Sequence, residues 1–354
     1  MTKYPRLKVN LEKIKHNAKR ISKKASEFNI DIAGVTKATC GDPKVANAMK
    51  EGGVNYIADS RIENIKKLRK SEFSKPLILL RTPMLSEIKK VVEFADISLN
   101  SEIPVIRELS NQSKKHGFKH KIILMVEMGD LREGINKKEI FGFIEKILKF
   151  EGIEIYGIGM NLACFGGVIP TEKKEEEICR ITEEIEKKFD INFKMISGGN
   201  SANIPLLFKK TSPTKINNYR IGEGILLGLE TVNRKPISST FQDAFILEAE
   251  IIELKRKPSV PKGEISQNAF GEKPDFQDKG KIDHGIVAIG RQDVIVEDLT
   301  PCDKNIEIIG SSSDHIILDI KKGDYEVGDI VRFNLKYGAL VHLYTSKYVG
   351  KCYC

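Results

Sequence analysis

Residues 75–100, KPLILLRTPMLSEIKKVVEFADISLN, carry the pattern that decides the fold. Two short apolar runs, KPLILLRTP (75–83) and ADISLN (95–100), lie on either side of the amphipathic segment MLSEIKKVVEF. Continuous apolar runs of this length are typical of parallel strands covered on both faces, and a helix joins two such strands into a strand–helix–strand unit. This stretch therefore predicts one unit of a parallel α/β fold.

The same alternation continues in both directions, from residue 30 to residue 228. An open doubly wound sheet would normally have fewer strands and a G-x-G-x-x-G turn after its first strand, and no such turn follows residue 37. Eight strands alternating with helices favour a closed (β/α)8 barrel of TIM type. The apolar runs that predict its strands are 30–37, 54–60, 75–83, 95–100, 121–129, 153–161, 193–200 and 217–228.

The pattern changes after about Val232. Short β-like runs, among them AFILEAEIIELK and LVHLYTS, fill the rest of the chain, with Gly, Pro and Asp turns and no strong helix between them. The sequence thus predicts a barrel domain over 1–232 and a C-terminal all-β domain over 233–354. Within the second domain, residues 256–283 are polar and turn-rich, and loops of this length are usually functional or disordered.

Composition and charge exclude several classes of protein. Hydrophobic residues make up 40% of the chain and charged residues 30%, which is typical of a folded globular protein. No apolar run approaches the roughly 18 residues of a membrane-spanning helix. The net charge of +9 comes from lysines and arginines beside acids, as in EKKEEEICRITEEIEKKF (172–189), which we interpret as solvated helix faces and not as a nucleic-acid surface. The opening residues lack the apolar core of a signal peptide, so we expect a cytoplasmic protein with no membrane or nucleic-acid partner.

Residues that could carry chemistry follow from the barrel, because the working residues of such barrels lie at the carboxyl ends of the strands. Lys37 ends the first strand, Arg132 lies just past the fifth, and Asn161 ends the sixth. The glycine-rich segments SGGNSAN (197–203) and RIGEG (220–224) follow or interrupt the last two strands. Either segment alone would be a tight turn; together, at this end of a barrel, their backbone N–H groups favour a phosphate site.

Lys37 adds a second requirement. A lysine at the end of a buried strand is costly unless it is paired or used covalently, although an arbitrary lysine usually extends to solvent. With a phosphate site on the same face, an imine between this lysine and a phosphate-bearing aldehyde explains both features, and pyridoxal 5'-phosphate is the cofactor with that chemistry. A metal-dependent barrel enzyme is the alternative, but the strand ends offer no convincing set of His, Asp and Glu ligands, so no metal is expected.

A set of motifs extends over nearly the whole chain: RLKVNLEKIKHN, AGVTKATCGDP, GDLREGI, YGIGMNLAC, ISGGNSAN, YRIGEGILLG, AIGRQDV, SSSDHIILD and TSKYVGK. With them the chain resembles the fold-type III pyridoxal-phosphate enzymes of the alanine racemase family, and it looks most like the ornithine racemases of that family. The resemblance implies a barrel followed by a β-domain, a head-to-tail homodimer in which both chains build each active site, and the interconversion of L- and D-ornithine by removal and return of the α-proton.

The resemblance also implies roles for single residues. Lys37 would bind the cofactor as an imine and act as one of two catalytic bases. Arg220 would face the pyridine nitrogen and keep it unprotonated, which limits side reactions. Arg132 would approach the phenolic oxygen of the cofactor and bind substrate, and Asn161 would replace a ring-stacking histidine. The remaining cofactor contacts would come from Asn200, Ser201, the backbone of Gly222 and Glu223, and Tyr348, which closes the site near the phosphate.

The second base departs from the family pattern. Alanine racemases use a tyrosine of the second chain early in the β-domain, but no tyrosine occurs between Tyr219 and Tyr325. The candidates for this role are Asp314 and His315 in SSSDHIILD, with Tyr348 behind them, and Asp314 is also a candidate for binding the substrate. For His315, an inward-facing strand histidine that moves no proton is an equal alternative.

Other functions remain open. The substrate could be lysine or alanine instead of ornithine. A fold-type III decarboxylase would pair the pyridine nitrogen with a glutamate, against which Arg220 argues, although Glu223 is near in sequence. A non-catalytic pyridoxal-phosphate-binding protein would have little use for the β-domain, since such relatives are barrels that end near residue 230.

Overall fold

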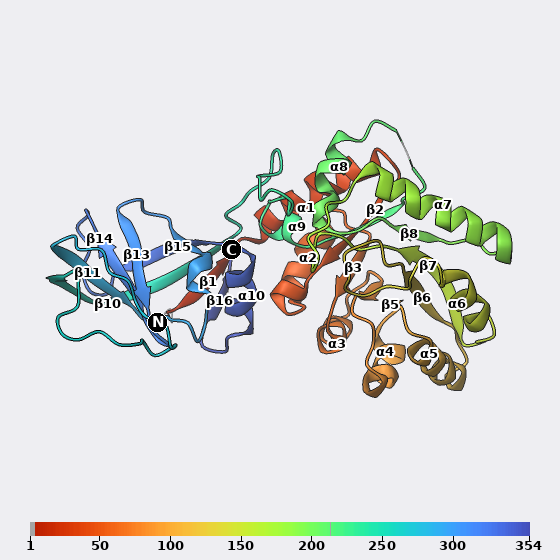
Figure 1. The fold of residues 1–354 in the computed structure, drawn as a ribbon, viewed down its shortest axis with the longest axis horizontal. Helices are drawn as coiled ribbons and strands as arrows, with labels where there is room; N and C mark the ends of the chain where they lie inside the picture. Colours follow the sequence, from red (N-terminus) through yellow and green to blue (C-terminus); the bar gives the residue numbers. More distant parts are fainter. Residues whose placement is uncertain (1–3, 213) are drawn as a thin grey trace. The chain divides into compact units, whose positions relative to one another are not determined.

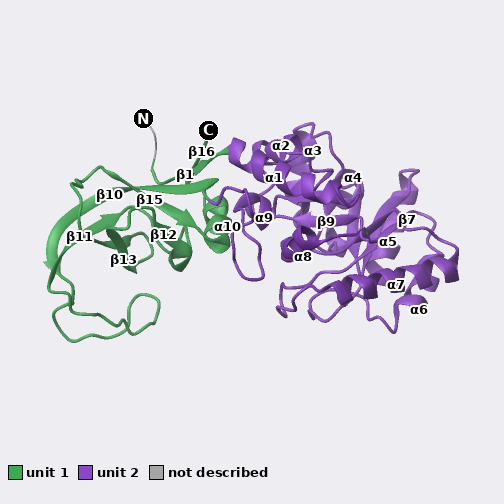
Figure 2. Cartoon of the chain, turned by 90° about the horizontal axis from the view of Figure 1, so that it is seen from above, with its two compact units in different colours: residues 1–10, 243–354 green, residues 11–242 purple. Residues whose placement is uncertain are grey.

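The computed structural model describes residues 4–212 and 214–354, which form two compact units (Figure 1, Figure 2). One unit is Leu11–Gln242, and the other combines the N-terminal residues up to Asn10 with Asp243–Cys354. In the part of the chain that the structure describes, no helix has both the length and the apolar character needed to cross a membrane.

A closed barrel of eight parallel strands forms the centre of the unit Leu11–Gln242. Neighbouring strands pair in chain order, and the last strand returns to the first, with Asn218 opposite Asp31. The closed barrel predicted from the alternating pattern is therefore confirmed. Its strands are β2 (Asp31–Val35), β3 (Tyr56–Asp59), β4 (Leu77–Leu79), β5 (Ile97–Asn100), β6 (His120–Met125), β7 (Ile153–Gly159), β8 (Met195–Ser197) and β9 (Asn218–Ile221).

Helices surround the barrel, as Figure 1 shows. The longer helices pack their apolar residues against the barrel. In helix α1, for example, Ile14 and Ile21 are fully buried. Burying one such side chain contributes about 1.5–3 kcal/mol. The helices of this unit are α1 (Leu11–Ser26), α2 (Pro43–Glu51), α3 (Ile62–Lys70), α4 (Ile88–Phe94), α5 (Ile103–Lys115), α6 (Ile140–Ile147), α7 (Glu172–Phe189), α8 (Ile204–Lys209) and α9 (Glu223–Leu226).

The interior of the barrel is a packed core. Apolar residues of six of the strands meet there: Ala33, Val35, Ala58, Ile78, Ile97, Leu99, Ile123, Met125 and Met195.

The predicted final strand, 217–228, is too long, because β9 ends at Ile221 and helix α9 begins at Glu223. The apolar run Ile225–Leu227 that suggested a longer strand is buried in and just after this helix.

The second unit is built on a mainly antiparallel sheet, which confirms the predicted all-β character of the C-terminal region. Six strands pair in the order β12-β15-β10-β11-β14-β13, and β1 pairs with β10 and β16. The strands are β1 (Arg6–Val9), β10 (Phe245–Pro258), β11 (Lys281–Val287), β12 (Leu299–Pro301), β13 (Ile306–Ser311), β14 (Ile316–Ile320), β15 (Ile330–Leu335) and β16 (Gly350–Tyr353).

Two features of this unit differ from the sequence analysis. Strand β1, placed in domain 1–232 by its position in the chain, pairs with the β-sheet, where the Arg6 guanidinium donates to the Glu248 carboxylate at 2.7 Å. The predicted strand LVHLYTS is wrong, because all of it except its last residue, Ser346, lies in helix α10 (Tyr337–Thr345). That helix is apolar on most of its surface, so it lacks the clear periodicity that distinguishes a helix from a buried strand.

The polar segment 256–283 is shorter as a loop than predicted. Strands β10 and β11 remain paired as far as Pro258 and Lys281. Beyond them, the Ser259 N–H donates to the Gly280 carbonyl at 2.8 Å, and the Lys279 N–H donates to Oγ of Ser259 at 2.7 Å. The loop between the strands is therefore closed at its base.

Candidate active site

Lys37 follows strand β2 and begins a short 3-10 helix, η1 (Lys37–Thr39). Its side chain is exposed, and within residues 4–212 and 214–354 no hydrogen bond or ion pair engages its ammonium group. The preceding Thr36 is buried and donates from Oγ1 to Oδ2 of Asp59 at 2.8 Å. The ends of β2 and β3 are thus held together directly beneath Lys37.

Asp59 is a site residue that the sequence analysis missed. It ends strand β3 and also accepts hydrogen bonds from Asn64 Nδ2 at 2.9 Å and the Arg61 N–H at 3.0 Å. Burial raises the pKa of Asp59, and these hydrogen bonds act in the opposite direction. The signal for it was its position, since the strand run in VNYIADS (54–60) closes with the carboxylate of Asp59, on the strand after that of Lys37.

The two glycine-rich turns meet as expected of a common site. Oγ of the buried Ser201 accepts hydrogen bonds from the N–H groups of Gly222 at 3.3 Å and Gly224 at 3.2 Å. A Cβ on Gly222 would lie 3.2 Å from Cβ of Val35, two residues before Lys37. The turns after β8 and β9 and the strand of Lys37 are therefore neighbours. Glu223, the first residue of α9, forms an ion pair with Arg234 through its side chain.

The two predicted asparagines also lie together. Asn200 donates from Nδ2 to Oδ1 of Asn161 at 3.1 Å and to the carbonyl of Leu162 at 2.7 Å. Its own Oδ1 accepts from the Ala202 N–H at 2.8 Å, which caps the short helix that begins at Ser201. This arrangement requires Gly199 at φ +139°, where a side chain would collide with Asn203.

Arg220 lies buried in strand β9. In the described ranges the partners of its guanidinium are all neutral: it donates to Oγ of Ser197, to the Met160 carbonyl at 2.7 Å and to Oδ1 of Asn161 at 3.3 Å. Burial lowers the pKa of Arg220 to about 10, so the group stays cationic at neutral pH. A buried cation without an acidic hydrogen-bond partner suits an acceptor that is itself neutral.

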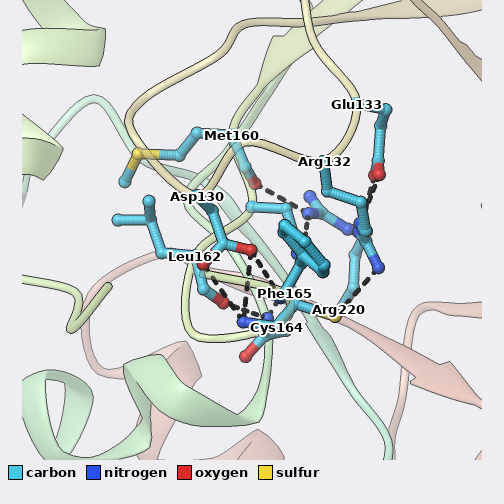
Figure 3. A network of polar contacts seen from close by, with 10 residues as sticks. Asp130, Arg132, Glu133, Met160, Leu162, Cys164, Phe165 and Arg220 are labelled. Atoms are coloured by element: carbon cyan, nitrogen blue, oxygen red, sulfur yellow. Dashed lines mark hydrogen bonds and ion pairs between the residues drawn. The ribbon is translucent and has the colours of Figure 1, made fainter. Parts of the chain in front are cut away.

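Arg132 lies in the loop after β6, in contact with a second loop (Figure 3). Its Nη2 donates to Oε1 of Glu133 at 2.6 Å and its Nη1 donates to Sγ of Cys164 at 2.9 Å. The buried Asp130 accepts the N–H groups of Cys164 at 3.2 Å and Phe165 at 2.9 Å. Asp130, Glu133 and Cys164 were not predicted, although two acids near Arg132 in GDLREG were visible in the sequence.

The candidates for the second base belong to the β-sheet unit and line one cavity there, with a volume of about 450 Å³. Asp314 accepts from Oγ of Ser313 at 2.7 Å, and Nδ1 of His315 lies 3.3 Å from Oγ of Ser312. His315 lies in the turn between β13 and β14, directly before the strand in which the sequence analysis placed it as an alternative. The cavity is lined by Pro5, Ala288, Gln292, Asp293, Asp314, His315 and Tyr348.

Comparison with known proteins finds a family match that extends over the barrel unit. Residues 9–229 match the model of the alanine racemase N-terminal domain family. The chain belongs to the alanine racemase family. The resemblance inferred from the motifs is thus confirmed.

Several relatives share almost the full length of this alanine racemase family member. An ornithine racemase from Acetoanaerobium sticklandii is 41% identical over 351 residues, which cover 98% of this chain and 99% of the relative. A lysine racemase from Thermotoga maritima is 40% identical over 351 residues, covering 99% and 98%. Among solved structures, the alanine racemase from D-cycloserine-producing Streptomyces lavendulae superposes with a TM-score of 0.78 over 100% of this chain and 98% of the other, at 15% identity.

Proposed function

We propose that the protein is a pyridoxal-phosphate-dependent amino-acid racemase that interconverts L- and D-ornithine. The observation that carries this proposal is the ammonium of Lys37 after β2, which has no hydrogen-bond or ion-pair partner among the described residues and lies near the joined turns of Ser201 and Gly222. The full-length similarity to an ornithine racemase supports ornithine as the substrate.

The residues present fit this cofactor. Lys37 would hold it, the N–H groups of the turn at Gly222 and Glu223 with Ser201 and Asn200 would bind its phosphate, and Tyr348 would close that end of the site. Arg220 offers its nitrogen a cationic donor whose observed partners are neutral. When bound, pyridoxal phosphate withdraws electrons from the α-carbon of an amino acid and makes its α-hydrogen acidic.

The chain itself supplies orientation and proton transfer. The guanidinium of Arg132 would bind the substrate carboxylate, and Asn161, which accepts hydrogen bonds from Asn200 and Arg220, would contact the cofactor. The amine of Lys37 takes or returns the α-proton on one face of the α-carbon. Inversion needs a second group on the opposite face, and we propose Asp314 or His315 for this role, with Tyr348 beside them in the same cavity.

We also propose that the enzyme works as a homodimer in which each chain contributes residues to the site of the other. The resemblance supports this assembly, as does the division of the candidate residues between two units of the chain. The six free cysteines support a cytoplasmic location, because thiols stay reduced there.

The test is incubation of the cofactor-loaded protein with L-ornithine in deuterated water, followed by chiral analysis and mass spectrometry. We expect D-ornithine that carries one deuterium at the α-carbon. Lys37→Ala should abolish the reaction and the visible absorbance of the bound cofactor, whereas Lys67→Ala, an exposed lysine on α3, should leave both unchanged. Release of carbon dioxide instead of D-ornithine would favour the decarboxylase, and no α-proton exchange with any amino acid would contradict an enzymatic role.

Lysine is the second candidate substrate, because the lysine racemase relative is as similar as the ornithine racemase. The two amino acids differ by one methylene, which a binding pocket distinguishes by about 10- to 200-fold. Comparison of kcat/KM for L-ornithine and L-lysine decides between them.

A further inference from the structure

We propose that Glu133 is a positioning residue that fixes the guanidinium of Arg132, an inference that rests on the proposed role of Arg132 in binding substrate. Oε1 of Glu133 accepts from Nη2 of Arg132 at 2.6 Å, and Oε2 forms an ion pair with Nε of the same group. A carboxylate that meets one edge of a guanidinium in this way fixes the plane of the arginine as well as its position. Glu133 thus occupies one edge of Arg132 and leaves the remaining donors to other partners.

The opposite side of the guanidinium is held by a second loop. Nη1 of Arg132 donates to Sγ of Cys164 at 2.9 Å. Asp130 fastens this loop to the loop of Arg132, because its carboxylate accepts the N–H groups of Cys164 and Phe165 and its carbonyl accepts the N–H of Gly166 at 3.0 Å (Figure 3). Arg132 is therefore held between Glu133 and Cys164, and the loop that carries Cys164 is itself fixed by Asp130.

The backbone of both loops is strained next to these contacts. Leu131, directly before Arg132, has φ +56°, and Ala163, directly before Cys164, has φ +50°. The left-handed conformation is unfavourable for a residue with a Cβ, and such strain concentrates at functional sites. The Leu131 side chain is 73% exposed, so burial of that side chain does not offset the strain. These strained residues precede Arg132 and Cys164, whose side chains contact each other through Nη1 and Sγ.

Glu133 also offsets the repulsion between two arginines. Burial is the main cause that lowers the pKa of Arg220, the charge of Arg132 lowers it further, and the charge of Glu133 raises it. The charge of Glu133 therefore acts on both cations, and Figure 3 shows Arg132, Glu133 and Arg220 in the same network. Without the carboxylate, Arg132 would lose its edge contact and be repelled from Arg220.

The test compares Glu133→Gln, Glu133→Asp and the matched control Glu145→Gln, which removes a solvent-exposed glutamate that pairs with Lys188 on the outer helices. Two quantities are measured: KM and kcat for L-ornithine, and the rate at which iodoacetamide alkylates Cys164, followed by peptide mass spectrometry. For Glu133→Gln we expect KM to rise about tenfold while kcat falls less than about threefold. We expect alkylation of Cys164 to slow by about threefold, because Nη1 of Arg132 no longer donates to its Sγ.

Recovery of both quantities toward wild type in Glu133→Asp, with no change in Glu145→Gln, would support the proposal. An unchanged KM in Glu133→Gln, or alkylation that is unchanged or faster, would overturn it. A raised KM without slower alkylation would also overturn it, since Glu133 would then act on the substrate and not through Arg132. If the wild type has no racemase activity, the proposed function fails, whereas the alkylation rates still decide whether Glu133 positions Arg132.

Discussion

The hydroxyl of Tyr219 on strand β9 donates a hydrogen bond to the buried carboxylate of Glu175 on helix α7. The same carboxylate accepts from Nδ2 of Asn203 at 3.2 Å and from Nζ of Lys210 at 3.1 Å. Burial and the charge of Glu175 both raise the pKa of Tyr219, so its hydroxyl remains a donor. Because Asn203 also accepts the N–H of Asn200 at 3.2 Å, this one carboxylate supports the turn that carries Ser201.

Glu175→Gln should therefore destabilise the protein. It should also lower the affinity for the cofactor, because the turn of Asn200 and Ser201, proposed to bind the phosphate, loses support. The substitution leaves the nearly buried ammonium of Lys210 without its partner, at a cost of about 3–5 kcal/mol. Tyr219→Phe removes only the neutral donor and should cost about 1–2 kcal/mol. Urea unfolding measures both free energies, and a fluorescence titration of the cofactor measures the effect on its affinity.

The matched control is Glu183→Gln on the same helix, where an exposed carboxylate pairs with Lys215 at 3.3 Å. An exposed pair contributes at most about 1 kcal/mol, so this variant should unfold almost like the wild type. Equal losses from Glu175→Gln and Glu183→Gln would show that the buried network carries no special stability.

The barrel was predictable because its determinants are local. A buried parallel strand must be apolar on both faces, so runs such as Leu77–Leu79 stand out from the amphipathic helices around them. The residues at and near the strand ends follow from that assignment, which is why Lys37, Arg132 and Arg220 could be named from the sequence. The barrel determines that they lie at the carboxyl ends of its strands.

The remaining features depend on contacts between distant parts of the chain. Glu175 lies in the charged run 172–189, which is otherwise typical of a solvated helix face. Its contacts with Tyr219, Asn203 and Lys210 distinguish it from its neighbours. Strand β1 looks like the start of the barrel domain until its pairing with β10 and β16 is known. Sequence periodicity carries no information about such partners.

The second catalytic group makes a separate prediction. Asp314 and His315 lie in one cavity, and whichever of them delivers the proton on the second face is needed for inversion but not for exchange on the first face. In deuterated water, Asp314→Asn or His315→Gln should reduce inversion by at least about 100-fold while L-ornithine still exchanges its α-hydrogen. Full inversion by both variants would exclude both residues and leave Tyr348 as the candidate.

His120, the first residue of β6, should make stability depend on pH. Its buried Nε2 lies 2.9 Å from Oγ of Ser98, and burial lowers the pKa of His120 from 6.5 to about 4, opposed by the charge of Asp96. As pH falls through 6.5 the unfolded chain binds a proton that the folded protein does not. The folded state should therefore lose about 2 kcal/mol of stability from this group between pH 7 and pH 4.5.

Urea unfolding at pH 7 and pH 4.5 gives the change in the free energy of unfolding for each variant. Comparing this change between variants cancels the contribution of the other titrating groups. His120→Gln should lose about 2 kcal/mol less than the wild type over this interval. His116→Gln, which removes an exposed histidine at the end of α5, should keep the wild-type difference. A wild-type difference in His120→Gln as well would assign the pH dependence to other groups.

Gly134 and Gly142 form a matched pair that tests how rigid the loop of Arg132 must be. Gly134 has φ +150°, and a Cβ there would lie 2.5 Å from the Glu127 backbone nitrogen. At this point the loop returns to β6, and the Ile135 N–H donates to the Met125 carbonyl at 2.7 Å. Backbone cannot move aside as a flexible side chain can, so Gly134→Ala should cost at least about 2 kcal/mol and raise KM for the amino acid by displacing Arg132. Gly142 lies within helix α6 with open space around it, and Gly142→Ala should stabilise the protein by about 0.5–1 kcal/mol without changing KM. If Gly134→Ala unfolds like Gly142→Ala and keeps the wild-type KM, the loop tolerates displacement and its geometry does not set substrate binding.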